Sequence, residues 1–182
     1  MGNFRLIILL VLIPLLIGFT SIESKRQKET SRPIPPKIGD LAPEISLPSI
    51  DGATIYKLSD LKGKLVLVNF WASLAAPCRF ENPNLVKVYQ NYKDKSFQTG
   101  EGFTIYSVSM DTDIENWKNG IAKDKLTWPY HVSDLQGYDS KVVSDYGVKA
   151  IPYNFLIDGT GKIIAINLRG VELAKTLDAQ LK

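Results

Sequence analysis

The chain has 182 residues, of which 45% are hydrophobic and 23% are charged. That length supports one ordinary domain with a short appendage and excludes two full hydrophobic cores. The composition excludes a disordered chain, a collagen-like repeat and a miniprotein stapled by disulfides. The sequence has one Cys and one His, which excludes an internal disulfide and a Cys/His zinc site. We therefore expect no metal and no cofactor.

The net charge of +3 is unevenly distributed along the chain. Residues 1–37 contain six basic and two acidic residues and carry +4, so the remaining residues together carry −1. Nucleic-acid binding needs basic residues clustered on one face, and a nearly neutral body does not predict it. The basic residues follow an apolar run, which predicts a membrane surface as their neighbour.

An apolar run at 6–19, interrupted by one Pro and one Gly, follows Arg5 near the N-terminus. Its length is typical of the apolar part of a secretory signal, about 7–15 residues, and is short of the roughly 20 residues that span a membrane. We predict a signal peptide or membrane anchor over residues 1–22, with cleavage left open, and a polar, proline-containing linker over 23–37. The domain that follows is expected outside the cytoplasm, in the periplasm or cell envelope, and attached to the membrane if the leader is retained.

From residue 38 onward, strand-like and helix-like patterns alternate. The first expected elements are two short strands at 45–47 and 53–56 around a turn, a turn or single helical turn at 59–63, a strand at 64–71 and a helix at 77–92. The run 64–71 is almost continuously apolar, which is typical of a central strand buried on both faces. The spacing in the long helix predicts a buried face that includes Phe80, Leu85 and Val88. Pro83 should kink this helix or limit its first turn.

The second half of the body continues the alternation. Its expected elements are a strand at 103–110, a helix at 114–124, a short helix at 141–146 ended by Gly147, strands at 154–157 and 163–166 joined by a hairpin turn, and a helix at 171–182. His131 is expected in a loop or on the surface, whereas Trp117 and Trp128 are expected in the core. This order of strands and helices predicts a mixed α/β sandwich.

Residues 69–83 read Asn-Phe-Trp-Ala-Ser-Leu-Ala-Ala-Pro-Cys-Arg-Phe-Glu-Asn-Pro. This segment resembles the active site of the extracytoplasmic TlpA/ResA-like thiol–disulfide oxidoreductases of the AhpC/TSA-redoxin superfamily, whose pattern is Phe-Trp-Ala-(Ser/Thr)-Trp-Cys-x-Pro-Cys-Arg-x-Glu-x-Pro. Residues 39–47 are similar to the family's first strand, and residues 146–158 to the segment that carries its cis-proline, here Pro152. The resemblance implies a thioredoxin-like α/β fold over residues 38–182, with a central mixed sheet, flanking helices and an N-terminal β-hairpin extension.

The sequence departs from the family at the residues that carry its chemistry. The family's first cysteine aligns with Ala75 and the Trp before it with Leu74, while the second cysteine remains as Cys78. In the family, a thiolate at a helix N-terminus attacks a disulfide, and the second thiol resolves the mixed disulfide. Ala75 has no nucleophile, so the incomplete Ala-x-x-Cys motif predicts impaired disulfide exchange. Whether the protein is an enzyme stays open.

Two other functions stay open beside this one. The first is a non-catalytic module that binds a peptide, or a thiol- or disulfide-bearing protein, at the edge formed by Pro152. The expected neighbours of that edge are Trp71, Pro77 and Ile151. The second is a one-cysteine peroxidase that uses Cys78 and resembles the peroxiredoxins, although the Thr of that family is replaced by Ala at position 75. Against the peroxidase stands the interpretation of Cys78 as a small buried residue whose pKa is raised.

Other side chains near the motif have simpler interpretations. Arg79 and Glu81 match the family pattern and are interpreted as an ion pair on the helix surface. Trp71 is expected to be a packing wall beside the site rather than a functional group. Glu44 is a candidate to approach the site from the first strand.

Overall fold

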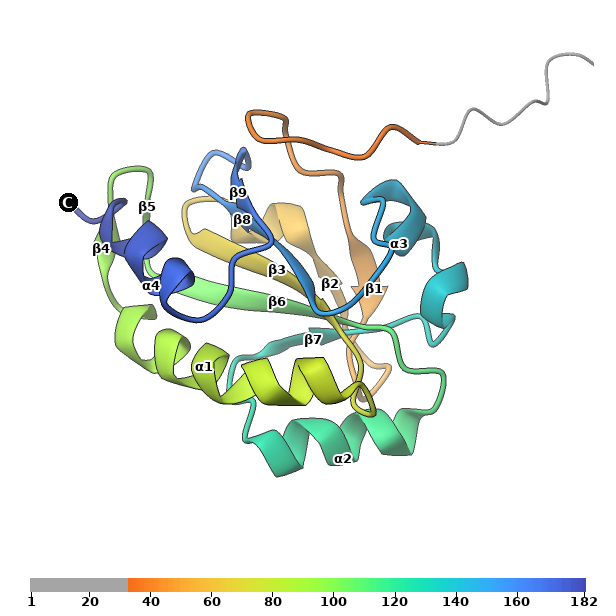
Figure 1. The fold of residues 1–182 in the computed structure, drawn as a ribbon. Helices are drawn as coiled ribbons and strands as arrows, with labels where there is room; N and C mark the ends of the chain where they lie inside the picture. The colour runs from red at the N-terminus through yellow and green to blue at the C-terminus, as the bar shows by residue number, and fades with distance from the viewer. Residues whose placement is uncertain (1–32) are drawn as a thin grey trace, which may run out of the picture. The chain divides into compact units, whose positions relative to one another are not determined.

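The computed structural model describes residues 33–182. The predicted leader and residues 23–32 of the predicted linker lie outside the described residues. A five-stranded sheet in the order β7-β6-β3-β8-β9 forms the centre of the domain (Figure 1). Its strands are β3 (Leu65–Trp71), β6 (Phe103–Ser109), β7 (Tyr130–Val132), β8 (Tyr153–Ile157) and β9 (Ile163–Ile166). Since β3 pairs in parallel with β6 and antiparallel with β8, the predicted mixed sheet is confirmed.

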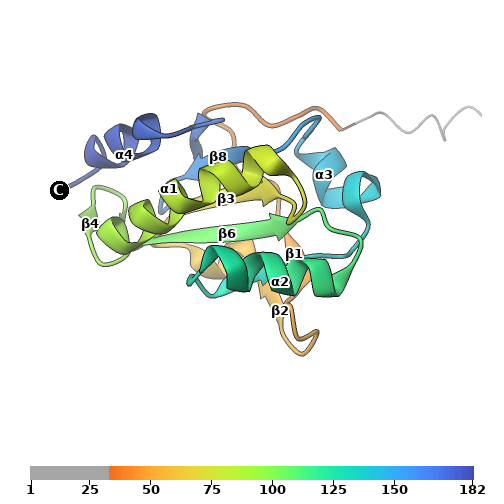
Figure 2. The same ribbon diagram turned by 60° about the horizontal axis from the view of Figure 1, so that its bottom comes forward.

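Helices and a small hairpin cover the two faces of this sheet. One face carries α1 (Ala76–Tyr92), α2 (Ile114–Asp124) and α4 (Val171–Asp178), of which α1 and α2 lie side by side across the strands (Figure 2). The other face carries the predicted N-terminal hairpin and two short helices. These elements are β1 (Ser46–Pro48), β2 (Ile55–Lys57), η2 (Leu58–Leu61) and α3 (Lys141–Asp145).

The apolar side chains of the central strand β3 contribute to the hydrophobic clusters on both faces of the sheet. Successive side chains of a strand point to opposite faces of the sheet. Leu67 and Trp71 belong to the buried cluster under α1, α2 and α4, whereas Val68 and Phe70 belong to the cluster under the hairpin and α3. All seven residues of β3 are buried, as its continuous apolar pattern predicts.

The pairing register brings three segments to one edge of the sheet. Trp71 at the end of β3 is opposite Ser109 at the end of β6, because parallel strands end on the same side. Phe70 is opposite Tyr153, the first residue of antiparallel β8. The loop after β3, the loop after β6 and Pro152 therefore lie at the same edge, where the motif resemblance places the site.

Several short elements do not appear in the sequence prediction. They are β4 (Ser96–Phe97), β5 (Gly100–Glu101), β7 and η3 (Gly137–Asp139). Segments of two or three residues contain too little of any period to be recognised unless a turn signal marks them, as it does between β1 and β2. The last helix also ends at Asp178 rather than at residue 182, because Leu181 forms a bridge with Phe97 and the amide of Lys182 donates to the carbonyl of Ser96.

The prediction for Phe80 is wrong. Its side chain is 90% exposed, although α1 runs through Pro83 to Tyr92, the end that the pattern predicts. The buried face of α1 includes Cys78, Asn82 and Leu85. Each helical residue turns about 100°, so a residue two positions from Cys78 points to the opposite side. The periodicity failed here because two buried positions are not aliphatic or aromatic.

The prediction for His131 is also wrong. The residue is buried, lies in β7 opposite Ser107 and stacks on Trp128 with 5.6 Å between the ring centroids. Its Nε2 lies 3.2 Å from the carbonyl oxygen of Leu126. Burial lowers the pKa of His131 to about 4. Trp117 and Trp128 are buried, as predicted.

Candidate functional site

The loop after β3 leads directly into α1, and Ala75 is the residue at which the helix begins. Ala75 precedes the first helical residue, provides no side-chain cap, and its carbonyl accepts from the amides of Cys78 and Arg79 at 3.0 and 3.1 Å. Pro77 lies in the first turn, where the absence of an amide proton costs nothing. A thiolate at position 75 would meet the unpaired N–H groups of this helix end. The methyl group of Ala75 cannot accept hydrogen bonds from these N–H groups.

Cys78 is enclosed by the core rather than presented to solvent. Its side chain is 1% exposed and belongs to the same buried cluster as Trp71 and Leu85. Burial raises the pKa of the Cys78 thiol, and the nearby positive charge of Arg169 opposes this effect only in part. The thiol is therefore held in its neutral form, which is neither a nucleophile nor a metal ligand.

The residues before β8 form the second side of the site. The Ile151–Pro152 peptide bond is cis. Ile151, Pro152 and Tyr153 are each half-buried, and Ile151 packs against both hydrophobic clusters. Trp71 is fully buried and therefore packs in the core beside the site rather than at its surface. The structure thus brings Cys78 and Ile151 to one cluster, with Pro77 exposed on the helix above it.

Asp111 is a site residue that the sequence analysis missed. It follows β6 and is 6% exposed. Both of its carboxylate oxygens accept from the amide of Ser73 at 3.0 Å, and they also accept from the hydroxyls of Ser73 and Ser109 at 2.6 and 2.7 Å. These three residues form a buried polar network that holds the loop before Ala75. An acidic residue just after a predicted buried strand is the signal that could have revealed it.

Arg79 does not form the predicted surface ion pair with Glu81. It pairs instead with Asp124 at the end of α2, and its Nη1 donates to the carbonyl of Ser73 at 2.9 Å. Burial raises the pKa of Asp124, but the hydrogen bonds from Arg79 and Asn82 outweigh this effect and leave that pKa below its ordinary value. Ser73 is consequently held on both sides, through its N–H and hydroxyl by Asp111 and through its carbonyl by Arg79.

Arg169 is a second residue that the sequence analysis missed. Its guanidinium donates to the carbonyl oxygens of Pro152 and Leu168, and burial lowers its pKa. Glu81 lies in α1, and its carboxylate accepts a hydrogen bond from the amide of Gly170 at 3.0 Å. The loop before α4 is thereby fastened to both sides of the site. A single Arg beyond the motif carried no sequence signal for this role.

Glu44 does not approach the site. Its carboxylate accepts from the amides of Ile45 and Ser59 and lines a cavity of about 150 Å³ beside Val66 and Ile157. Those two residues are paired at the other end of β3 and β8 from the site. Glu44 therefore caps the start of η2.

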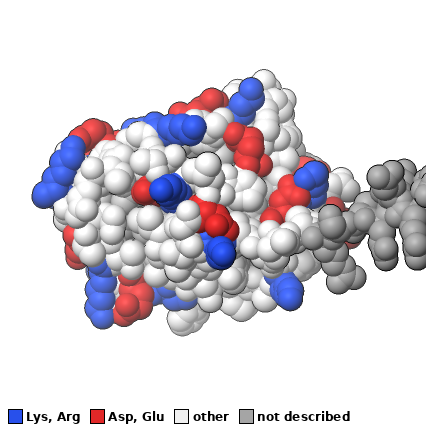
Figure 3. Space-filling model, turned by 90° about the horizontal axis from the view of Figure 1, so that it is seen from above, with Lys and Arg blue, Asp and Glu red and all other residues white. Residues whose placement is uncertain are grey.

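The described residues offer neither a metal-binding cluster nor a membrane-spanning helix. In residues 33–182, the side chains of His, Cys, Asp and Glu form no group of three or more that could hold a metal ion. No helix in this part of the chain is both long and apolar enough to cross a membrane. On the face seen in Figure 3, acidic and basic side chains are interspersed among larger uncharged areas.

Comparison with known proteins agrees with this geometry. Residues 38–166 match the AhpC/TSA family. The thiol-disulfide oxidoreductase ResA of Bacillus thuringiensis subsp. konkukian is 34% identical over 180 residues, which cover 98% of this chain and 94% of the relative. The thioredoxin-like protein YneN of Bacillus subtilis is 29% identical over 171 residues, 94% of each chain.

Solved structures give the same result for the fold. The thioredoxin domain of a thiol-disulfide oxidoreductase from Bacteroides vulgatus superposes with a TM-score of 0.70 at 38% identity, covering 79% of this chain and 97% of that domain. A thiol-disulfide oxidoreductase from Bacteroides fragilis has a TM-score of 0.68 at 32% identity, covering 77% and 98%. The predicted thioredoxin-like fold is confirmed, and the chain belongs to the AhpC/TSA family.

Proposed function

We propose that the protein is an extracytoplasmic thioredoxin-like member of the thiol–disulfide oxidoreductases that does not complete a cycle of disulfide exchange. The observation that carries this proposal is Ala75 at the N-terminus of α1. Exchange needs a thiolate that attacks one sulfur of the substrate disulfide and a second thiol that resolves the mixed disulfide. Position 75 has no sulfur, and the burial of Cys78 supports a thiol that stays protonated and inaccessible.

The test is insulin reduction with dithiothreitol, comparing the native protein with Ala75→Cys. The native protein should not exceed the uncatalysed rate. Ala75→Cys should reduce insulin measurably, because a thiol at the start of α1 should have a pKa below about 8.5 and lie near Cys78. Ala75→Cys combined with Cys78→Ser is the control that lacks the resolving thiol. Native activity above background would contradict the proposal, and inactivity of Ala75→Cys would implicate further residues such as Leu74.

The extracytoplasmic location is motivated by the apolar run at 6–19 and the basic residues after it. The segment acts as a signal peptide or, if retained, as a membrane anchor. Cell fractionation with an antibody to the domain tests this location. Recovery of the full-length chain as a soluble cytosolic protein would contradict it.

The second candidate function is a non-catalytic module that holds a thiol- or disulfide-bearing protein. The observation that favours it is the half-buried apolar stretch of Ile151, Pro152 and Tyr153. An edge of this kind can pair with an extended chain without any cysteine. This role therefore survives the loss of the nucleophile.

Labelling of Cys78 with a thiol reagent in native buffer separates these possibilities. Labelling only after denaturation supports the binding module, as the 1% exposure of Cys78 leads us to expect. Rapid stoichiometric labelling would favour chemistry at Cys78 instead, including the one-cysteine peroxidase. A peroxidase needs peroxide to reach the sulfur, so the burial of Cys78 gives that function the least support.

A further inference from the structure

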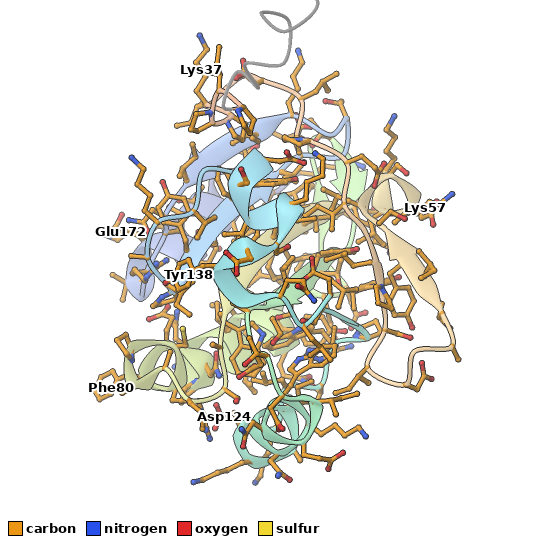
Figure 4. The ribbon with its side chains drawn as sticks, turned by 90° about the vertical axis from the view of Figure 1, so that its right-hand side faces the viewer. Lys37, Lys57, Phe80, Asp124, Tyr138 and Glu172 are labelled. Carbon is orange, nitrogen blue, oxygen red and sulfur yellow. The ribbon has the colours of Figure 1, made fainter. Side chains whose placement is uncertain are left out.

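A cavity lies at the end of the sheet opposite the motif, where the start of β3 and the end of β8 meet. Its volume is about 150 Å³, and it is lined by residues of the N-terminal segment, η2 and the β8–β9 turn. Val66 lines it and precedes Trp71 by five residues of β3, which corresponds to roughly 16 Å. Lys37, which precedes the N-terminal wall, projects from the opposite side of the domain to Phe80 and Asp124 (Figure 4). The cavity is therefore separate from the site already described.

The floor of the cavity is apolar and belongs to the core. It is formed by Leu58, Leu61, Val66 and Ile157, which are between 3% and 8% exposed. A cavity of about 150 Å³ lined by such side chains holds a molecule of the size of benzene. An apolar group that fills it is removed from water, which is favourable through the hydrophobic effect. The size and the lining together favour one six-membered ring or one branched alkyl group.

The N-terminal wall of the cavity is held in place by backbone hydrogen bonds. The amide of Ala42 donates to the carbonyl of Gly161 at 3.0 Å, and both of these small residues line the cavity. Two more bonds, of 2.8 and 2.9 Å, join Gly39 and Asp40 to Ile163. A wall that is already ordered loses less conformational entropy on binding than a mobile one.

The mouth of the cavity carries more negative than positive charge. Its charged lining residues are Glu44, Asp158 and Lys62, and among residues 33–182 no ion pair includes any of them. The charge of Glu44 acts on the phenols of Tyr106 and Tyr146, whose pKa values are raised mainly by burial and further by Glu44. A neutral phenol does not neutralise a carboxylate, so the mouth favours a cation over an anion.

Glu44 is the carboxylate best placed to receive such a cation. Its Oε1 accepts from the amides of Ile45 and Ser59 at 3.0 and 3.2 Å. These bonds fix the carboxylate and leave Oε2 available to a donor from outside. Asp158 serves its own turn instead, where its Oδ1 accepts from the amide and the hydroxyl of Thr160.

We propose that this cavity binds a small organic cation, namely a primary amine on one compact apolar group. The apolar group packs against Val66 and Ile157, and the ammonium pairs with Oε2 of Glu44. The proposal goes beyond the proposed function and does not rest on it, because no lining residue belongs to the motif or to the Ile151–Tyr153 edge.

The test is an NMR titration of the ¹⁵N-labelled full chain with benzylamine, benzyl alcohol and benzoate, which share a ring and differ in charge. Benzylamine should shift the amide signals of Ser59, Lys62 and Gly161 but not those of Cys78 and Arg79. We expect a Kd on the order of 1 mM, as a ligand of so few atoms allows. Exposed ion pairs contribute modestly, so benzylamine should bind about threefold more tightly than benzyl alcohol. Benzoate should bind more weakly than either.

Three variants assign the contacts. Glu44→Gln keeps an acceptor for both amides and should abolish the preference for benzylamine over benzyl alcohol. Asp60→Asn is the matched control, because it removes the same charge from η2 outside the cavity, and it should keep the preference. Ala42→Leu should fill the cavity and weaken the binding of both ligands, and the dispersion of its own spectrum shows that it is folded.

Three results would overturn the proposal. Tightest binding by benzoate would assign the polar contact to Lys62 rather than to Glu44. An unchanged preference in Glu44→Gln, or equal Kd values for all three ligands, would exclude the cation as the ligand class. Unshifted signals of Ser59 and Gly161 at a tenfold excess over the expected Kd would exclude the site itself. The insulin assay with Ala75→Cys reports on the other end of the sheet, so either proposal can fail without the other.

Discussion

Two regions of the site contrast with each other. The loop before α1, where the family motif has its nucleophile, departs from that motif, whereas the polar network beneath the loop is complete. Exposed Leu74 and half-buried Ala75 stand where the motif resemblance implies an aromatic residue and a cysteine. Below them, Ser73, Ser109 and Asp111 form a fully hydrogen-bonded cluster, and Arg79 and Asp124 remain paired. The loop thus departs from the family motif, whereas the hydrogen bonds that support it are complete.

The contrast has an energetic reason. An exposed side chain at a helix start can change at little cost to folding, since surface substitutions usually alter stability by less than about 0.5 kcal/mol. A buried carboxylate is different, because removing it leaves its hydrogen-bond donors without partners at a cost of about 1–3 kcal/mol for each group. The network therefore stabilises the fold whether or not position 75 holds a thiol.

The strongest test of this contrast is Asp111→Ala. The change leaves the amide and hydroxyl of Ser73 and the hydroxyl of Ser109 without their acceptor, so we expect the free energy of unfolding to fall by roughly 3 kcal/mol or more. Urea titration followed by tryptophan fluorescence measures it. In the same experiment Ala75→Ser should be neutral or raise stability by about 1 kcal/mol, because Ser caps a helix better than Ala. Equal losses for both variants would remove the contrast.

The pH dependence of stability extends the contrast to His131. The folded-state pKa is lowered to about 4 from an ordinary value of 6.5, so the unfolded chain binds the proton first as the pH falls. The stabilisation by neutral His131 is complete above about pH 6.5 and is lost as the pH decreases toward 4. We expect the free energy of unfolding to drop by roughly 2 kcal/mol between pH 7 and pH 5.

Urea titrations at several pH values check this prediction, with His131→Asn as the control. The variant should be less stable at pH 7 but should lose much less stability between pH 7 and pH 5. Carboxylates titrate mainly below this window. A native protein with flat stability from pH 7 to pH 5 would show that His131 is not enclosed as described.

A smaller effect is expected for Gly120→Ala, which probes the close approach of α2 to the loop at Ser73. The new Cβ would lie 2.6 Å from the Cβ of Ser73 and 3.3 Å from the Trp71 ring. Overpacking of this kind costs about 1–3 kcal/mol, and the higher helix propensity of Ala returns up to about 1 kcal/mol. A net loss of roughly 1 kcal/mol is expected by urea titration, whereas Asn119→Ala on the exposed side should not destabilise the protein.

The smallest effect is expected for Phe80→Ala. Its side chain is 90% exposed, so the free energy of unfolding should change by less than about 0.5 kcal/mol. Leu85→Ala on the same helix is the matched comparison, and because Leu85 is 1% exposed it should lose about 2–5 kcal/mol. A large loss for Phe80→Ala would mean that Phe80 belongs to the core, in conflict with its exposure.

Local and strongly periodic features were predictable from the sequence. The structure confirms helix α2 with the bounds that the pattern predicts, Ile114–Asp124, and Asp113 caps it through the amide of Asn116 at 2.7 Å. It also confirms the buried central strand, the N-terminal hairpin and the long helix expected at 77–92, which begins one residue earlier, at Ala76. Each depends on residues close together in the chain, or on ordered motifs that a family resemblance can carry.

The partners of the site were decided only by the tertiary structure. Asp111 reaches Ser73 across 38 positions, Arg79 reaches Asp124 across 45, and Arg169 reaches Pro152 across 17. A pattern of apolar residues says which face of a helix or strand is buried, but it does not say which polar groups meet once the sheet aligns its strand ends. The same limit explains Phe80 and His131, because the exposure of each depends on how its helix or strand is placed against the rest of the domain.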